Sequence, residues 1–328
     1  MNSKNVLIIG ANSFSGSAFA NDLPKSYVRH LVFRNELPSS VFNPNDQRRE
    51  HETSTRWNLN DDCRKILELI NENEVGTVVN FAAQSMVGQS WENPADWYEA
   101  NVVSLSKLVS SISQHCKIES FIQFSTPEVY GSTSGWVKEN FNFAPNSPYA
   151  VSRAASDWHL KALFENKDFP VIFTRAANVY GEHQRLYRII PKLVLSGLTG
   201  KRVALQGGGK SIRSFIHIDD VNNALIKVME NGKLGETYHI STKELVSIYD
   251  LAVLVARKMN TQIEDLIEEV PDRVGKDFAY QLDSEKIRLE LGWCDQVSLD
   301  RGLDRTIAWV SKNLPELSAM STDYTHRK

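Results

Sequence analysis

The chain of 328 residues holds 40 acidic and 37 basic side chains, a net charge of -3 at pH 7, and its basic residues are scattered, so we expect no nucleic-acid partner. Its three cysteines lie far apart, without histidine or cysteine at ligand spacing, which predicts neither disulfides nor a bound metal. No stretch is apolar over the roughly 20 residues that a membrane helix needs, so we predict a cytoplasmic protein with no membrane partner.

The first residues have the pattern of a dinucleotide-binding βαβ unit. Residues 6–9 are apolar and predict a buried strand, and residues 14–23 predict a helix. Between them, Gly10 allows a tight turn and Gly16 allows close packing of helix on strand, while Ser13 stands where this motif has its middle glycine. A dinucleotide pyrophosphate would lie at the helix N-terminus, although glycine-rich turns also occur in ordinary strand–turn–helix units.

Arg34 follows the second predicted strand, residues 28–33. Sites specific for NAD have an acid at this position to bind the ribose hydroxyls, whereas an arginine can pair with the 2′-phosphate of NADP. We therefore expect bound NAD(P) with a slight preference for NADP, and Glu36 or a shifted register could restore the acid. Residues 35–56 are polar and predict a long loop, and residues 57–59 predict the third strand.

Further along, helices and strands alternate as they do around a parallel sheet. The apolar residues 77–81 predict a strand, and the small residues Ala82 and Ala83 after it leave room for a cofactor. We predict helices at residues 61–73, 94–109, 150–164, 248–259 and 303–312, and further strands at residues 121–124, 170–175, 214–218 and 237–240.

Polar side chains follow the strand predicted at residues 121–124. Ligands of open α/β sheets lie outside the carboxyl ends of the strands. A substrate should therefore be met by the side chains of Ser125, Thr126, Glu128 and Tyr130.

Tyr149 and Arg153 form a second candidate pair. They are four residues apart, so the helix predicted at residues 150–164 would place them on one face. The arginine cation would lower the pKa of the phenol, and a tyrosinate could take a proton from an alcohol as hydride leaves the same carbon.

Motifs along nearly the whole chain carry a resemblance to a known family. They are GANSFSG near the start, VVNFAAQSMVGQSWENP at 78–94, STPEVYG at 125–131, SPYAVSR at 147–153, NVYG at 178–181, GGGKSIRSFIHIDDV at 207–221 and DRVGKD at 272–277. In this order they resemble the extended short-chain dehydrogenase/reductases, specifically the dTDP-glucose 4,6-dehydratase-like branch of the NDP-sugar dehydratase/epimerase family.

The resemblance implies an α/β fold in which a Rossmann-type doubly wound parallel sheet binds the cofactor and a smaller, interleaved C-terminal α/β lobe binds the substrate. The cofactor domain would span residues 1–177 with parts of 211–245, and the nucleotide-sugar lobe residues 178–328. A nucleotide-diphosphate sugar is the implied substrate. The implied homodimer is formed by the helix at 94–109 and the helix that carries Tyr149.

The resemblance also assigns roles to individual residues. Tyr149, with Thr126 and Arg153 beside it, is the implied base at the sugar C4 hydroxyl, and Glu128 is the implied base at C5. The residues expected to bind the cofactor are Gly10, Ser13, Phe14, Gly16, Arg34, Asn58, Leu59, Ala82, Ala83, Gln84, Asn101, Tyr149 and Arg153. Those expected to bind the substrate are Ser85, Thr126, Glu128, Asn178, Arg188, Arg213 and Arg273. Among these, the arginine guanidinium groups suit phosphate.

The resembling dehydratases oxidise the sugar at C4, eliminate water across C5 and C6 and return the hydride to C6, which gives an NDP-4-keto-6-deoxyhexose. Pro127 replaces the aspartic acid that precedes the glutamate in this branch, so Glu128 would both take the C5 proton and protonate the leaving oxygen. Arg153 replaces the usual lysine and keeps the charge, but places its donors differently.

Other functions stay open at this point. An epimerase, a C4 dehydrogenase or a uronate decarboxylase of the same family would share the oxidation at C4 and differ afterwards. The substitutions at Ser13, Arg34, Pro127 and Arg153 would also fit a non-catalytic nucleotide-sugar binding protein, because fold alone does not imply activity. The sequence indicates neither the base nor the sugar of the substrate.

Overall fold

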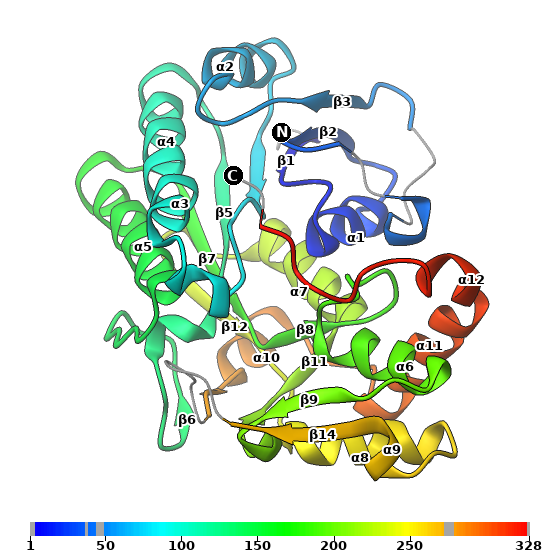
Figure 1. The fold of residues 1–328 in the computed structure, drawn as a ribbon. Coiled ribbons are helices and arrows are strands. Elements are labelled where there is room, and N and C mark those ends of the chain that lie inside the picture. The colour runs from blue at the N-terminus through cyan, green and yellow to red at the C-terminus, as the bar shows by residue number, and fades with distance from the viewer. Residues whose placement is uncertain (1–3, 37–38, 44–48, 272–278, 327–328) are drawn as a thin grey trace.

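The computed structural model describes residues 4–36, 39–43, 49–271 and 279–326, and its centre is a parallel sheet (Figure 1). Within these residues, seven strands are ordered β12-β7-β5-β4-β1-β2-β3, and each neighbouring pair is parallel. The strands are β1 (Asn5–Ile9), β2 (Val28–Phe33), β3 (Thr53–Arg56), β4 (Thr77–Asn80), β5 (Ser120–Ser125), β7 (Val171–Ala176) and β12 (Thr237–Ile240).

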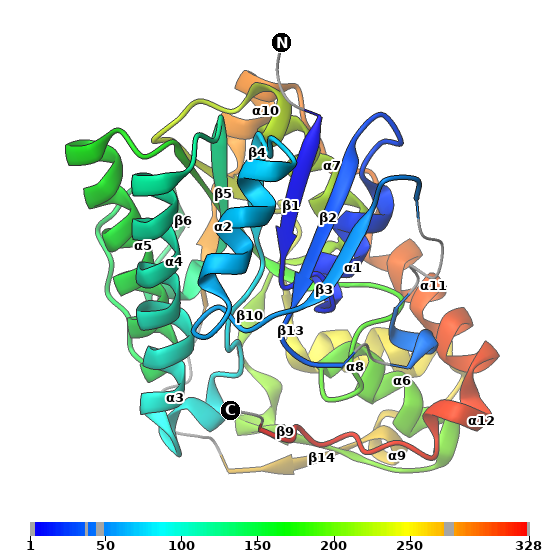
Figure 2. The ribbon, with the colours of Figure 1, turned by 90° about the horizontal axis from the view of Figure 1, so that it is seen from above.

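Alternate residues of the strands face two different cores, one on each side of the sheet. On β1, Val6 and Ile8 belong to one core and Leu7 and Ile9 to the other. Helices α1 (Phe14–Asp22), α7 (Ile218–Asn231) and α10 (Glu285–Leu291) complete the first core, and α2 (Cys63–Glu72), α4 (Ser104–His115) and α5 (Pro148–Lys167) the second. Figure 2 shows these two layers of helices. This arrangement confirms the predicted Rossmann-type doubly wound fold.

A separate core lies in the lower right part of Figure 1, here called the lower lobe. It contains α6 (Ile189–Thr199), α8 (Ile248–Lys258), α9 (Ile263–Leu266), α11 (Leu299–Lys312), α12 (Leu314–Leu317) and the parallel pair β9 (Val203–Gln206) and β14 (Ile267–Val270). Smaller pairs join β8 (Asn178–Tyr180) to β11 (Phe215–His217), β10 (Ile212–Arg213) to β13 (Val246–Ser247) and β6 (Trp136–Val137) to β15 (Gln281–Leu282). The chain leaves this part to form α7 and β12 and then returns to it.

The third strand of the sheet lies earlier than predicted, at Thr53–Arg56 instead of residues 57–59. Asn58 ends the extended run because its side-chain oxygen accepts a hydrogen bond from the Asn60 amide (3.0 Å), which starts the turn into α2. The predicted loop at residues 35–56 therefore contains this strand.

The helix predicted at residues 94–109 is interrupted. It begins as α3 (Pro94–Tyr98), passes through a π-helical turn at Glu99–Val103 and continues as α4. Such π turns occur frequently at functional sites. Asn101 lies in this one and is buried.

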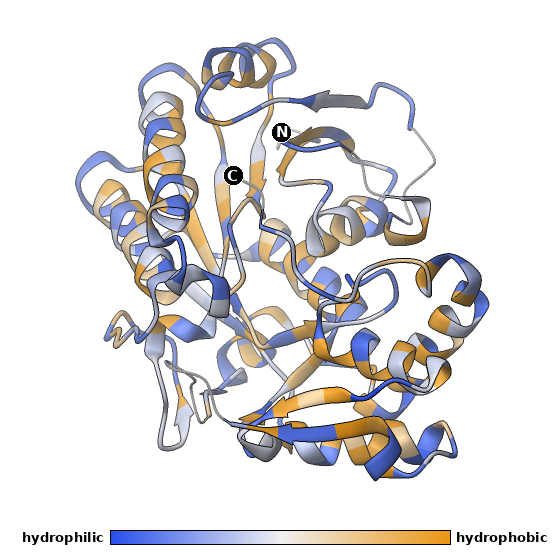
Figure 3. Cartoon of the chain, viewed as in Figure 1, coloured by the Kyte–Doolittle hydropathy of each residue, from blue (hydrophilic) through white to orange (hydrophobic). Residues whose placement is uncertain are grey.

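Figure 3 shows apolar residues along the central strands and a mixture of apolar and polar residues around the flanking helices. This is the pattern of helices that bury one face. In the described parts of the chain, none of the helices has the length and apolar character needed to cross a bilayer.

Candidate active site

The turn between β1 and α1 fits a dinucleotide. Gly10 has a φ of +77°, and a Cβ there would lie 2.8 Å from the Ala82 amide nitrogen. A Cβ on Gly16 would lie 2.3 Å from the Gly10 carbonyl oxygen. Ser13 caps the helix that begins at Phe14, because its hydroxyl accepts a hydrogen bond from the Gly16 amide (3.1 Å). The serine thus stabilises the helix whose N-terminus would face a pyrophosphate.

Residues after β2 and β3 lie at the same edge of the sheet. The Arg34 carbonyl accepts a hydrogen bond from Arg56 Nε (3.3 Å). Glu36, the acid that could replace the usual one, forms an exposed ion pair with Arg56 (3.3 Å). The side-chain oxygen of Asn58 accepts the Asn60 amide hydrogen bond within its own turn, and Leu59 packs against the core that includes α2.

A buried asparagine shapes the segment after β4. Asn101 Oδ1 accepts a hydrogen bond from the Gln84 amide (2.8 Å), and Asn101 Nδ2 donates to the Gln84 carbonyl (3.0 Å) and to the Ser152 hydroxyl (2.8 Å). Asn101 therefore joins this segment to α5 through its Nδ2. Ala82 is half-buried and Ala83 exposed at the mouth of the site.

Tyr149 lies in the first turn of α5, one turn before Arg153, as the spacing predicts. Ser147 caps the helix by accepting a hydrogen bond from a backbone amide (3.2 Å), and Pro148 is its first residue. The Thr126 hydroxyl lies close enough to the Tyr149 phenol to lower its pKa. The carboxyl end of β5 and the start of α5 therefore meet at the phenol.

Electrostatics at Tyr149 differ from the prediction. Burial raises the pKa of the phenol, the Arg153 and Arg188 charges oppose this rise, and the Glu128 charge adds to it. The net rise contradicts the predicted tyrosinate at neutral pH, because desolvation of the phenolate outweighs the nearby cations. The protein by itself holds a neutral phenol.

Arg153 is buried beneath the site and hydrogen-bonded to the backbone of β5. It is 2% exposed, and its Nη2 donates a hydrogen bond to the Phe124 carbonyl (2.5 Å). Its Nε is buried and finds no hydrogen-bond acceptor within the described chain. A buried donor without a partner is costly, and a ribose hydroxyl of a bound nucleotide could supply the acceptor. The residues present therefore fit a nicotinamide dinucleotide.

The turn after β5 presents Glu128 beside Tyr149. Thr126 precedes a 3-10 turn at Pro127–Tyr130, and its Oγ1 accepts a hydrogen bond from the Glu128 amide (3.3 Å). Glu128 is half-buried, while Thr126 and Pro127 are buried. The structure thus brings together all four residues predicted to be catalytic: Thr126, Glu128, Tyr149 and Arg153.

A buried charged network that the sequence analysis missed holds both ends of this turn. Asp157 Oδ2 accepts hydrogen bonds from the Ser125 hydroxyl (2.8 Å) and from Arg175 Nη2 (3.0 Å). Arg175 Nη1 donates to the Tyr130 hydroxyl (2.7 Å), which lies 2.8 Å from His239 Nε2. Burial, with the Arg175 charge, lowers the pKa of His239 well below its usual range. Arg175 lies inside a strand that the sequence predicts to be apolar, and this could have indicated a buried charged network.

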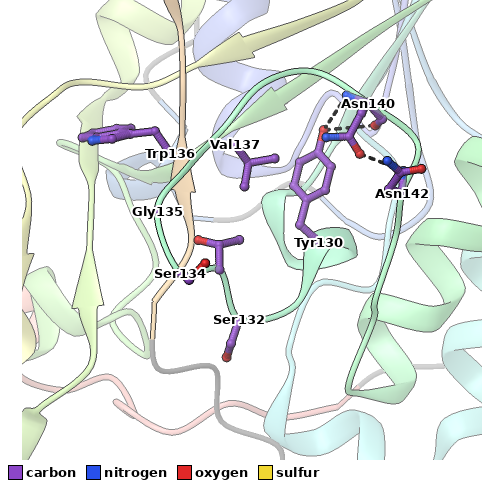
Figure 4. Close-up of a pocket in the computed structure, with 9 residues that line it drawn as sticks. Tyr130, Ser132, Ser134, Gly135, Trp136, Val137, Asn140 and Asn142 are labelled. Carbon is purple, nitrogen blue, oxygen red and sulfur yellow. Dashed lines mark hydrogen bonds between the residues drawn. The ribbon is translucent and has the colours of Figure 1, made fainter.

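Tyr130 therefore does not meet a substrate as predicted. Its hydroxyl points into the network, and its ring lines a cavity of about 370 Å³ beside the turn (Figure 4). The cavity is lined by Tyr130, Ser132, Thr133, Ser134, Gly135, Trp136, Val137, Asn140 and Asn142. The four clustered catalytic candidates are not among these described lining residues, so the cavity is a neighbour of the site.

The predicted substrate residues form two groups. The Arg213 guanidinium lies 4.4 Å from the centre of the Tyr280 ring, and the Tyr280 hydroxyl donates a hydrogen bond to Asn178 Oδ1. The sequence analysis did not single out Tyr280, which joins the two. In the second group, Arg188 Nη2 donates to the Ser85 hydroxyl (3.0 Å).

Arg273 lies outside the described residues. The described chain offers no group of three or more His, Cys, Asp or Glu side chains that could hold a metal ion.

Comparison with known proteins gives consistent matches. A family model described as GDP-mannose 4,6 dehydratase matches residues 7–306. The human dTDP-D-glucose 4,6-dehydratase is 31% identical over 319 residues, which cover 94% of this chain and 91% of that protein. A trifunctional UDP-glucose 4,6-dehydratase/3,5-epimerase/reductase of Arabidopsis thaliana is 30% identical over 321 residues, and these cover 94% of this chain but only 48% of that longer protein.

Solved structures give the same result. The dTDP-glucose 4,6-dehydratase DesIV from Streptomyces venezuelae, with NAD bound, has a TM-score of 0.87 and 28% identity over 95% of this chain and 98% of its own. A UDP-glucuronic acid 4-epimerase from Bacillus cereus, in complex with UDP-glucuronic acid and NAD, has a TM-score of 0.86 and 25% identity over 94% and 99%. The chain therefore belongs to the family of GDP-mannose 4,6 dehydratase and the dTDP-glucose 4,6-dehydratases, within the extended short-chain dehydrogenase/reductases.

Proposed function

We propose that the chain is a nucleotide-sugar 4,6-dehydratase that oxidises C4 of an NDP-hexose with bound NAD(P), eliminates water across C5 and C6, and returns the hydride to C6. The observation that carries this proposal is the cluster of Thr126, Glu128, Tyr149 and Arg153 at the carboxyl end of β5. A 4-epimerase or C4 dehydrogenase needs the tyrosine but no base at C5, so Glu128 favours the dehydratase.

Tyr149 would take the proton of the C4 hydroxyl. The Thr126 hydroxyl and the Arg153 charge both stabilise the phenolate. When bound, oxidised nicotinamide would supply the hydride acceptor and a positive charge, and this charge would favour the Tyr149 phenolate. This charge would offset the burial that raises the pKa of Tyr149 in the protein alone.

Glu128 would act after the oxidation. A ketone at C4 makes the C5 proton acidic, and the Glu128 carboxylate would take that proton. Pro127 next to it carries no acid, so the same carboxyl would return the proton to the C6 oxygen as the C6–O bond breaks and water leaves. When hydride returns to C6, C5 would take a proton from solvent, and the proton that Tyr149 took from the C4 hydroxyl would be released to balance it.

The cofactor would be a nicotinamide dinucleotide on the Gly10–Gly16 turn, with Arg153 Nε donating to it. NAD is bound in the DesIV and epimerase structures. Arg34 stands where a 2′-phosphate would be met and favours NADP slightly.

The substrate would be a nucleotide-diphosphate sugar held by residues 178–328. Arg213 and Asn178, joined through Tyr280, would meet its phosphates and nucleoside. Arg273 and the pair of Arg188 and Ser85 complete the proposed set.

The active protein would be a cytoplasmic homodimer. Exposed apolar or aromatic side chains on α3 and α5, namely Tyr98, Val151 and Trp158, support an interface on this face. Three free cysteines suit a reducing compartment.

Incubation with dTDP-, UDP-, GDP- and CDP-hexoses, followed by mass spectrometry of the products, tests the proposal. We expect loss of one water and a 4-keto group with one of these donors. An unchanged mass with inverted stereochemistry would indicate an epimerase, and loss of carbon dioxide from a uronate a decarboxylase. Binding without any conversion would indicate a nucleotide-sugar binding protein.

A further inference from the structure

Residues 318–326, here called the strap, run across the molecule after α12. Figures 1 and 2 show this segment crossing from the lower lobe toward α3 of the sheet domain. Thr322, Tyr324 and His326 are half-buried, whereas Ser321, Asp323 and Thr325 are exposed. This alternation is that of an extended segment with one face against the protein.

The strap is attached at both ends. On the side of the lower lobe, Met320 packs against its core, and Asp323 Oδ1 lies 3.4 Å from Lys192 Nζ of α6. At the other end, the His326 ring stacks on Trp97 with 4.8 Å between centroids, and His326 Nε2 lies 2.8 Å from Asp96 Oδ2. Both Asp96 and Trp97 belong to α3, so the strap bridges the two parts of the molecule.

Between these attachments, Tyr324 contacts the mouth of the site. Its hydroxyl donates a hydrogen bond to Gln84 Oε1 (3.3 Å), and its ring meets Tyr187 edge-on at 5.2 Å. Burial raises the pKa of the Tyr324 phenol, and the charges of Arg188 and Arg34 oppose this rise. Tyr324 therefore lies within electrostatic reach of both arginines.

The strand order identifies the part of the sheet that lies next to Tyr324. Arg34 follows β2 and Gln84 follows β4, and these two strands flank β1 in the sheet. Tyr324 is hydrogen-bonded to Gln84 and feels the charge of Arg34, so it lies near the carboxyl end of β1, where the Gly10–Gly16 turn begins. In doubly wound sheets this is the groove for the dinucleotide.

We propose that the strap closes this groove over a bound nicotinamide dinucleotide and that Tyr324 is a cofactor-binding residue. The inference rests on the proposed use of NAD(P). A cofactor that is reduced and reoxidised within one turnover has no need to leave, and a cover attached to both lobes slows its release. The matched family model ends at residue 306, before the strap begins, so the feature is not part of the matched region.

Hydrogen exchange of the wild-type protein, with and without NAD⁺ or NADP⁺, provides the first test. A cover gains contacts when the groove is filled, so the amides of residues 321–326 should exchange more slowly in the presence of dinucleotide. A plug that must leave the groove would exchange faster, and that result would overturn the proposal.

The rate of dinucleotide release, followed by fluorescence, provides the second test. Tyr324→Ala and His326→Ala should each release the cofactor about tenfold faster, since each loses a ring contact and a hydrogen bond. Thr325→Ala is the matched control, because this neighbouring side chain is exposed. A thermal melt identifies a variant that has lost its fold.

The outcomes separate the strap from the proposed function. If the wild-type protein bound neither dinucleotide, both proposals would be wrong. If it bound one of them but Tyr324→Ala released it at the wild-type rate, or held it more tightly, only the role of the strap would be wrong.

Discussion

Burial and the nearby arginine charges act on the pKa of Tyr149 in opposite directions. Desolvation raises the pKa of the phenol, Glu128 adds to the rise, and Arg153 opposes it. The same carboxylate that would serve as the C5 base therefore makes the first proton transfer harder. We infer that Tyr149 and Glu128 act at separate steps, the second only after the cofactor has been reduced.

Two variants should stall at different steps. Tyr149→Phe should bind substrate but form little reduced cofactor, whereas Glu128→Gln should accumulate reduced cofactor and a 4-keto sugar that keeps its C6 oxygen. Loss of a positioned acid–base group costs about 10²- to 10⁴-fold in rate. Single-turnover absorbance and product mass measure both effects. Elimination at the native rate in Glu128→Gln would refute its assignment as the C5 base.

The charge of Arg153 should be visible in the pH dependence of the oxidation. Arg153→Lys keeps a cation and should retain activity. Arg153→Met removes a positive charge that opposes the effects of burial and of Glu128 on the Tyr149 pKa. Because the base must be deprotonated, activity rises with pH through the Tyr149 pKa. The rising limb should therefore move to higher pH in Arg153→Met. An unchanged profile in that variant would show that the cation does not act on Tyr149.

At the scale of elements, β5, β7 and α5 meet at one buried ion pair. Asp157 of α5 and Arg175 of β7 are both fully buried, 3.0 Å apart, and the pair holds Ser125 and Tyr130 on either side of the turn that carries Glu128. Removing one partner of such a pair leaves an uncompensated charge in a low dielectric. The position of Glu128 therefore depends on this network.

Asp157→Asn should lower the free energy of unfolding by about 3–5 kcal/mol, since it leaves the buried Arg175 charge without its counter-charge. Urea unfolding measures the change. Glu165→Gln on the same helix is the control: Glu165, which pairs with the half-buried Lys161, is itself exposed, so we expect a loss of about 0.5 kcal/mol or less. Equal effects of the two substitutions would contradict a structural role for the buried pair.

At the scale of the whole molecule, two lobes meet at the carboxyl edge of the sheet. The Arg188–Ser85 hydrogen bond and the strap connect them across the proposed site. The proposed substrate residues of one lobe and the proposed catalytic residues of the other could act together only while this arrangement holds. The outer face of α5 stays exposed, which supports association with a second copy.

Val151→Glu should convert a dimer into a monomer, because Val151 is 40% exposed on α5 and a carboxylate there would have to be desolvated at the interface. Sedimentation velocity measures the change. Leu289→Glu is the control, since this side chain of α10 is 77% exposed and lies away from α5. A wild-type monomer, or a Val151→Glu dimer, would contradict an interface on this face.

Local pattern determined much of the molecule from the sequence alone. Apolar runs predicted six of the seven strands of the described sheet, and the spacing of Tyr149 and Arg153 predicted their shared helix face, because such features depend on neighbours within a few residues. The Gly10–Gly16 turn was also predicted from the sequence, although the helix cap formed by Ser13 was not.

Tertiary packing decided the rest. The π turn at Asn101, the Asp157–Arg175 pair and the contact of Tyr324 with Gln84 join segments that the sequence keeps far apart. The net pKa shift of Tyr149 was decided in the same way. Spacing along α5 places a cation near the phenol, but only the packing of β5 over α5 removes the water whose loss outweighs that cation.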